Sequence, residues 1–178
     1  GVVSETPFTK SERKAIITEG PFVITECPTE INSKDFATNG FLFFAGSMTV
    51  SQKVNITKEK GKRVVLALGK QNAPLIKVYV NGKFVKDSFW APYDIDITEA
   101  AVDGENEITL EVYASNRNLF GPHHNINGEC YNVGPESYTG KWSWVERKSE
   151  ADATDIYDTE KDYWTDTYCF VEFGLQLK

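Results

Sequence analysis

The sequence predicts an all-β fold, an antiparallel β-sandwich of jelly-roll type. Two observations lead to this class. Short segments alternate between apolar and polar residues, with turn residues between them, and no long window shows helical periodicity. Aromatic residues make up 13% of the chain, which suits a sheet protein because rings pack well on a pleated face. Alternation with period two is typical of a strand with one buried face.

The N-terminal part contains two alternating segments. Phe22 to Cys27 alternates, is closed by Pro28 and is expected to be a strand, and a continuous apolar run from Phe41 to Ala45 follows. The segment Met48 to Ile56 alternates again and is expected to be a strand. Its side chains on one face are Met48, Val50, Gln52, Val54 and Ile56.

The middle of the chain contains the strongest local signal. Arg63 to Leu68 is expected to be a strand, and Pro74 to Val80 is another, with Ile76, Val78 and Val80 on one face. Asn81-Gly82 follows, and both residues tolerate the positive φ that a type I′ hairpin needs. Lys83 to Lys86 is then the return strand.

Three further strands are expected: Tyr93 to Ile97, Asn106 to Tyr113, and an aromatic-rich run from Thr167 to Leu177 that only Gly174 interrupts. Thr98 to Ala101 is expected to form one helical turn, with Thr98 as its cap. Residues 121–140 and 149–166 are irregular in pattern and are interpreted as long loops, which in compact domains are usually functional or disordered.

Composition excludes several function classes. The net charge is −7 and no stretch is rich in Lys and Arg, so neither a nucleic acid nor an anionic membrane is an expected partner. No apolar run is long enough to span a bilayer, and no signal peptide opens the chain. Acidity favours solubility and also suits a neutral ligand. An odd number of cysteines, Cys27, Cys130 and Cys169, cannot form a closed disulfide framework, but the sequence is compatible with one disulfide between two of them.

A resemblance to a known family rests on the stretch from Arg63 to Asn118. It reads VVLAL, IKVYVNGKFV, WAPYDIDIT and GENEITLEV. This order resembles the sugar-binding jelly-roll domain of family 2-type glycoside hydrolases and related galactose-binding-like modules. Each motif has a structural role: Asn81-Gly82 forms the hairpin, and the Asn106 amide is able to bond neighbouring backbone groups.

Shorter motifs extend the resemblance from Gly40 to the end of the chain. Asn116 to His124, Val133-Gly-Pro135 and Phe173-Gly-Leu175 resemble C-terminal domains of some large bacterial glycoside hydrolases. The resemblance implies an extracellular or periplasmic bacterial protein. It also implies that residues 1–178 form a single jelly-roll domain, a fragment of a larger multidomain protein.

The adjacent His123 and His124 are the only histidines. Neighbouring side chains in an extended segment point to opposite faces, so one metal ion rarely takes both, and no spacing matches a zinc site. We expect loop histidines that hold backbone carbonyls, with a ligand hydrogen bond as the alternative. Cys130 lies nearby without a nucleophile motif. Arg117, just upstream, is able to bind sugar hydroxyls or to brace the following loop.

Acidic residues are plentiful between Glu146 and Asp166. A general acid needs a raised pKa, which usually needs burial, so a solvated acidic loop is a poor glycosidase site. No cofactor is predicted with certainty. A structural calcium ion is the alternative, since clustered carboxylates suit hard cations and the resemblance implies such ions.

Aromatic side chains are the better candidates for binding. Trp90 lies near Tyr93, and Trp142 and Trp144 are two positions apart, so on a strand they share a face. Flat rings stack on sugar faces, although they also form cores and docking surfaces. The candidate carbohydrate-binding residues are Trp90, Tyr93, Arg117, His123, His124, Trp142 and Trp144.

The sequence leaves three alternative hypotheses for the function of this chain. The first is a non-catalytic accessory module of a bacterial glycoside hydrolase, with carbohydrate and the parent catalytic domain as partners. The second is a structural or protein-interaction β-sandwich without sugar affinity. The third is a small independent hydrolase that uses the His123-His124 loop, and it requires a pocket where a histidine meets a carboxylate or Cys130.

Overall fold

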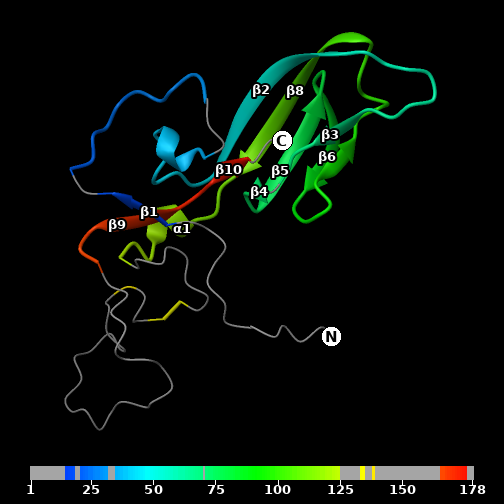
Figure 1. Cartoon of the computed structure of the whole chain (residues 1–178). Helices are drawn as coiled ribbons and strands as arrows, with labels where there is room; N and C mark the ends of the chain where they lie inside the picture. The colour runs from blue at the N-terminus through cyan, green and yellow to red at the C-terminus, as the bar shows by residue number, and fades with distance from the viewer. Residues whose placement is uncertain are drawn as a thin grey trace, which may run out of the picture. The chain divides into compact units, whose positions relative to one another are not determined.

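The computed structural model describes residues 15–18, 21–31, 35–69, 71–124, 133–134, 138 and 165–175 (Figure 1). Its contacts separate into two compact units, which we describe one at a time. Unit 1 comprises Gly1–Cys27 and Arg117–Glu172, and unit 2 comprises Pro28–Asn116 and Phe173–Lys178. The expectation of one domain over residues 1–178 stays a prediction.

Unit 2 contains most of the strands. They are β2 (Ser47–Ile56), β3 (Val65–Ala67), β4 (Gln71–Asn72), β5 (Leu75–Val80), β6 (Lys83–Ser88), β7 (Asp94–Asp96), β8 (Gly104–Tyr113) and β10 (Gly174–Leu175), with a short 3-10 helix η1 (Ala37–Asn39). β2, β8, β5 and β6 form one sheet in that order, while β3 pairs with β7 and β10 pairs with β4. All these pairs are antiparallel. The predicted all-β antiparallel sandwich is confirmed.

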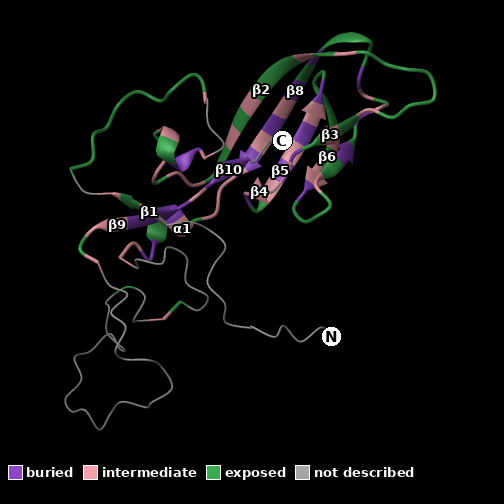
Figure 2. Ribbon diagram, in the orientation of Figure 1, coloured by how far each residue is buried: buried purple, intermediate pink, exposed green. Residues whose placement is uncertain are grey.

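The core of unit 2 lies on the inner face of the four-stranded sheet. Ile76, Val78 and Val80 of β5 are fully buried, as their period-two spacing predicts. Buried and intermediate positions alternate along β5 (Figure 2). Side chains from outside this sheet complete the same cluster, among them Leu68 and Ile95. Burying each such side chain contributes roughly 1.5–3 kcal/mol, so this cluster dominates the stability of the unit.

The Asn81-Gly82 hairpin is confirmed. Asn81 has φ 52° and Gly82 has φ 76°, and Val80 pairs with Lys83 across the turn. Positive φ at both central residues matches the right-handed twist of the flanking strands. The turn therefore sets the first two pairs, Val80 with Lys83 and Tyr79 with Phe84, and an irregularity between Val78 and Tyr79 then shifts the register by one residue.

Asn106 connects this hairpin to the start of β8. Its side chain is 1% exposed and its Nδ2 donates to the carbonyls of Val102 (2.8 Å) and Gly104 (2.9 Å). Its Oδ1 accepts from the Val102 amide (2.8 Å) and from Asn81 Nδ2 (2.9 Å). The expected bonding of Asn106 to neighbouring backbone is thus confirmed, and both polar atoms of its buried amide have partners.

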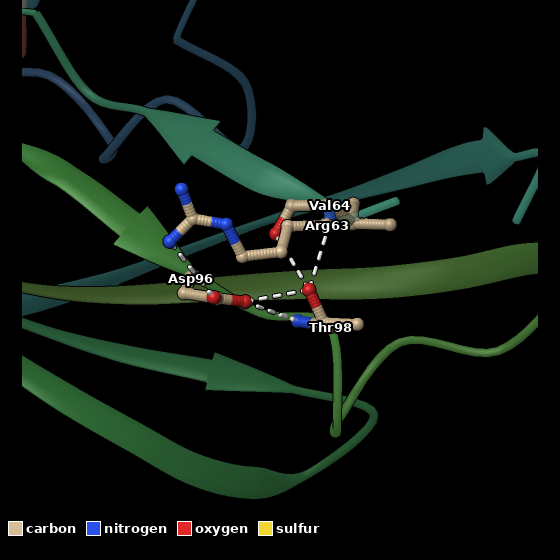
Figure 3. Close-up of polar contacts among 4 residues, drawn as sticks. All are labelled: Arg63, Val64, Asp96 and Thr98. Atoms are coloured by element: carbon tan, nitrogen blue, oxygen red, sulfur yellow. Dashed lines mark hydrogen bonds and ion pairs between the residues drawn. The ribbon is translucent and has the colours of Figure 1, made fainter. Parts of the chain in front are cut away.

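The turn after β7 differs from the prediction, because Thr98 is not its cap. Asp96 accepts hydrogen bonds from the Thr98 amide (3.0 Å) and hydroxyl (2.6 Å), while the Val64 amide donates to the Thr98 hydroxyl oxygen at 2.8 Å (Figure 3). The hydrogen bonds from the Thr98 hydroxyl and then from the Thr98 amide lower the pKa of Asp96. The Arg63 guanidinium, whose Nη1 lies 3.7 Å from Asp96 Oδ2, lowers this pKa further. The carboxylate is the stronger acceptor, so it takes the role assigned to the hydroxyl.

The predicted strand from Phe22 to Cys27 is wrong. This segment has no β pairing, and Val23 and Ile24 are 81% and 98% exposed. Phe22 instead sets its ring edge-on to Tyr168 at 5.1 Å. Alternation is a local property, whereas a strand requires a partner, and this segment has none among the described residues.

The predicted single strand from Thr167 to Leu177 is divided. In unit 1, β9 (Tyr168–Val171) pairs with β1 (Ala15–Thr18), while β10 pairs with β4 in unit 2. The chain leaves one sheet and enters another between Val171 and Gly174. Periodicity predicts strands but not their partners, so the sequence gives no sign of this change.

Candidate functional site

An exposed aromatic pair follows the end of β6 in unit 2. Trp90 is 70% exposed and Phe89 is 48% exposed, and their ring centroids lie 4.1 Å apart at 80°. A single exposed apolar side chain is ordinary, but two adjacent large rings left in water point to an interaction site. The edge-to-face contact holds the two rings in a fixed relation.

A small pocket of about 80 Å³ lies beside this pair. Ser88 is 4% exposed and its hydroxyl accepts a hydrogen bond from Gln71 Nε2 at 2.7 Å, which fixes the end of β6 against the neighbouring β4. The pocket is lined by Lys86, Asp87, Ser88, Phe89, Trp90 and Pro92.

The pocket combines flat rings with a cation and a carboxylate. Enclosed small-molecule sites have volumes of roughly 300–1,000 Å³, so this pocket receives only part of a ligand. Glycoside hydrolysis needs two carboxyl groups facing one bond, and Asp87 is the one acid in the lining of this pocket. The arrangement is suited to stacking and hydrogen bonding rather than to bond cleavage.

Tyr93 lies near this pair in sequence but differs in its surroundings. It is partly buried and packs against the core of unit 2, and its carbonyl accepts from the Leu68 amide at 3.2 Å. The structure therefore exposes Trp90 and anchors Tyr93. The two were predicted together as carbohydrate-binding residues, and that role stays a prediction for both.

His123 and His124 lie in unit 1, where they hold backbone. His123 Nε2 lies 2.9 Å from the Asn118 carbonyl oxygen. His124 Nδ1 lies 2.9 Å from the Thr165 carbonyl oxygen and 3.1 Å from that of Thr167. Since carbonyl oxygens only accept, the facing ring nitrogens carry protons. The expectation of loop histidines that hold backbone carbonyls is confirmed.

Arg117 opens the short helix α1 (Arg117–Phe120) in the same unit. The next residue, Asn118, is 4% exposed and pairs with the main chain of Val171, donating to its carbonyl at 2.8 Å and accepting from its amide at 2.9 Å. The Arg117 carbonyl accepts from the Gly121 amide at 2.9 Å. This stretch therefore braces the following loop against β9.

The pKa of His123 gives a testable pH dependence. Burial lowers this pKa below its ordinary value, while the hydrogen bond to the Asn118 carbonyl acts in the opposite direction. The charges of Arg117 and His124 lower the pKa further. A lowered folded-state pKa means that the folded chain favours the neutral His123 ring. The stability that this ring contributes is fully present above about pH 6.5, the pKa of the unfolded chain, and it is lost as the pH falls through the folded-state pKa.

We expect the melting temperature of the wild-type chain to drop between pH 7.5 and 5. In a His123→Asn variant, which is less stable at pH 7.5, the drop should be smaller because no imidazole is left to protonate. Differential scanning calorimetry at both pH values measures this. Equal drops in the two proteins contradict the assignment.

Several predicted residues lie outside the described part of the chain. They are Trp142, Trp144, Cys130 and the acidic residues before Thr165. Of the other cysteines, Cys27 is exposed and Cys169 is buried, and both are free. Among the described residues, no group of three or more His, Cys, Asp or Glu side chains is placed to hold a metal ion. Nor does any helix there have the length and apolar character to cross a membrane.

Phe89, Lys86 and Asp87 were not among the predicted site residues. A signal for them exists: the run Lys86 to Trp90 places two charged residues and two adjacent aromatics before Pro92. A period-two strand buries only one of two neighbouring side chains, so adjacent rings at a strand end leave at least one ring outside the core.

The fold is similar to part of a known structure, a rhamnosidase from Novosphingobium sp. PP1Y. The two share 24% sequence identity with a TM-score of 0.42, and the aligned region covers 79% of this chain and 12% of the rhamnosidase chain. No protein family and no curated protein sequence matches. The similarity is thus to a small part of a glycoside hydrolase.

Proposed function

We propose that this chain is a non-catalytic accessory module of a glycoside hydrolase, and that it binds carbohydrate at the Phe89-Trp90 pair. The exposure of Trp90 carries the proposal. A sugar ring offers an apolar C–H face to an indole ring and hydroxyl groups to its surroundings, so a site needs a flat ring beside polar groups. Lys86 and Asp87 supply a donor and an acceptor in the same pocket.

The sequence supports the accessory role independently of the pocket. Its resemblance to sugar-binding jelly-roll domains rests on the hairpin, the Asp96-Ile-Thr98 turn and Asn106, which are structural positions. The pocket adds the feature that those positions lack, a surface for a ligand. A site with one carboxylate suits binding without turnover.

The test is a glycan-array screen of the purified full chain. We expect the wild type to bind at least one glycan, and Trp90→Ala to lower the signal at least tenfold because the stacking surface is removed. Phe120→Ala is the matched control, since Phe120 is 66% exposed but lies in unit 1. It should bind like the wild type.

A Trp142→Ala variant tests the other predicted aromatic site in the same screen. Binding lost in Trp142→Ala and retained in Trp90→Ala, with both variants folded by circular dichroism, contradicts the proposed location. A folded wild type that binds no glycan contradicts carbohydrate binding itself and favours the structural or protein-interaction role.

A further inference from the structure

The outer face of the four-stranded sheet carries aromatic and charged side chains in register. Because Ile76, Val78 and Val80 face the core, Lys77 and Tyr79 of β5 face outward. Tyr79 is paired with Phe84 on β6, and their ring centroids lie 5.6 Å apart at 68°. Phe84 is 49% exposed. The face therefore holds a second aromatic pair, in which Phe84 is exposed and Tyr79 is half-buried.

A hydrogen-bond network fixes the neighbouring side chains. Glu111 on β8 accepts from the Tyr113 hydroxyl at 2.7 Å, and more weakly from Ser47 Oγ at 3.3 Å and Tyr79 at 3.5 Å. Lys77 Nζ lies 5.3 Å from the centre of the Tyr113 ring. Side chains held in this way lose little further freedom when a ligand is bound.

Asp87 joins this face to the Trp90 pocket. It lines the pocket and is also paired with Lys77 across β5 and β6. Phe84 and Trp90 are six positions apart in the sequence, which corresponds to at most about 20 Å of extended chain. Asp87 is thus the residue common to the Trp90 pocket and to the strand register of the outer face.

The charges on this surface are balanced. Lys77 lies opposite Asp87 in the register of β5 and β6, and opposite Glu111 in the register of β5 and β8. The two lysines of this surface, Lys77 and Lys86, stand against two carboxylates, Asp87 and Glu111, so no net positive charge attracts a carboxylate or sulfate on a ligand. The whole chain has a net charge of −7. Charge repulsion therefore weakens the binding of an acidic glycan but does not affect that of a neutral one.

We infer that the binding site extends from Trp90 across Asp87 and Lys77 to Tyr79 and Phe84, and that it takes a neutral oligosaccharide of several linked units. Trp90 stacks on one sugar ring and the Tyr79–Phe84 pair on another, while Asp87 and Lys77 bond hydroxyls between them. The inference rests on the proposed carbohydrate-binding function.

The experiment uses the full chain and one homologous series of neutral oligosaccharides, from disaccharide upwards, chosen from the array hits. Isothermal titration calorimetry should show affinity that rises with chain length. Phe84→Ala should lower the affinity for the longest member about tenfold and leave that for the disaccharide within about twofold. Phe120→Ala should follow the wild type throughout.

Salt provides a second measurement on the same samples. Affinity for the neutral series should change less than about twofold on raising the salt concentration from 0.05 to 0.5 M, because screening affects only charged ligands. Affinity independent of both length and Phe84, with Trp90→Ala still impaired, overturns the extended site and leaves the proposed function standing. Preferential, salt-sensitive binding of acidic glycans overturns the neutral class, and no glycan binding at all overturns both proposals.

Discussion

Alanine in place of Phe173 is expected to lower the free energy of unfolding of unit 2 by about 4 kcal/mol. Phe173 is 6% exposed, and its ring contacts Phe36 edge-on at 5.4 Å and stacks on Phe44 at 5.8 Å. Removing the ring leaves a cavity among aromatic side chains that cannot close it without moving the main chain.

The Phe173→Ala change isolates the ring, because the main-chain bonds of this residue remain. Its amide donates to Asp35 Oδ1 at 3.0 Å and its carbonyl accepts from the Phe36 amide at 2.6 Å. Urea denaturation gives the stability, and hydrogen exchange of peptides from β5 and β8 assigns the change to unit 2.

Phe89→Ala is the control for this experiment, since its ring is 48% exposed, and it should cost less than about 1 kcal/mol. A Phe173→Ala cost equal to that of Phe89→Ala means that the aromatic cluster does not support the sandwich.

Replacing Asn106 with alanine is expected to cost about 3 kcal/mol. The change removes both bonds to the Val102 main chain, the bond to the Gly104 carbonyl and the bond to Asn81. The Asn106 side chain is 1% exposed, so in the variant the main-chain groups that it bonds lose their partner on the buried side of the turn. Hydrogen exchange should therefore speed up first at the start of β8.

Two variants separate bonding from shape. Asn106→Asp retains the size of the side chain but loses the two Nδ2 donations to carbonyls, so it should be at least as unstable as the alanine variant. Asn55→Ala, at an exposed position on β2, should change stability by less than about 0.5 kcal/mol. Wild-type stability in Asn106→Asp contradicts the role of the donated bonds.

Part of the candidate site was accessible to sequence reasoning. Trp90 was predicted from its residue type and its place in or beside a predicted loop, and the structure exposes it. Lys86 and Asp87 were missed because a charged residue at a strand end is usually only solvated. Phe89 was missed although it is adjacent to Trp90 in the sequence. Tyr93 was placed beside Trp90 from nearness in sequence, but its position against the core depends on the packing of residues distant in the chain.

The contacts of His123 and His124 were likewise predictable only in part. Their bonding to backbone carbonyls was expected from their place in a loop, and it is confirmed. Which carbonyls they meet was not predictable, since Thr165 and Thr167 are 41 and 43 positions from His124 in the chain. Sequence spacing carries no information about contacts of that separation.

The sequence by itself determined the fold class, the Asn81-Gly82 hairpin, the buried face of β5 and the bonding of Asn106. These features depend on local properties, namely residue period, permitted backbone angles and short-range hydrogen bonds. Only the tertiary structure decided that Phe22 to Cys27 has no partner strand among the described residues, that the segment from Tyr168 to Leu175 divides between two sheets, and that Asp87 belongs both to the Trp90 pocket and to the register of the outer face. The reason is that pairing and exposure depend on chain segments far apart in sequence, which no local pattern records.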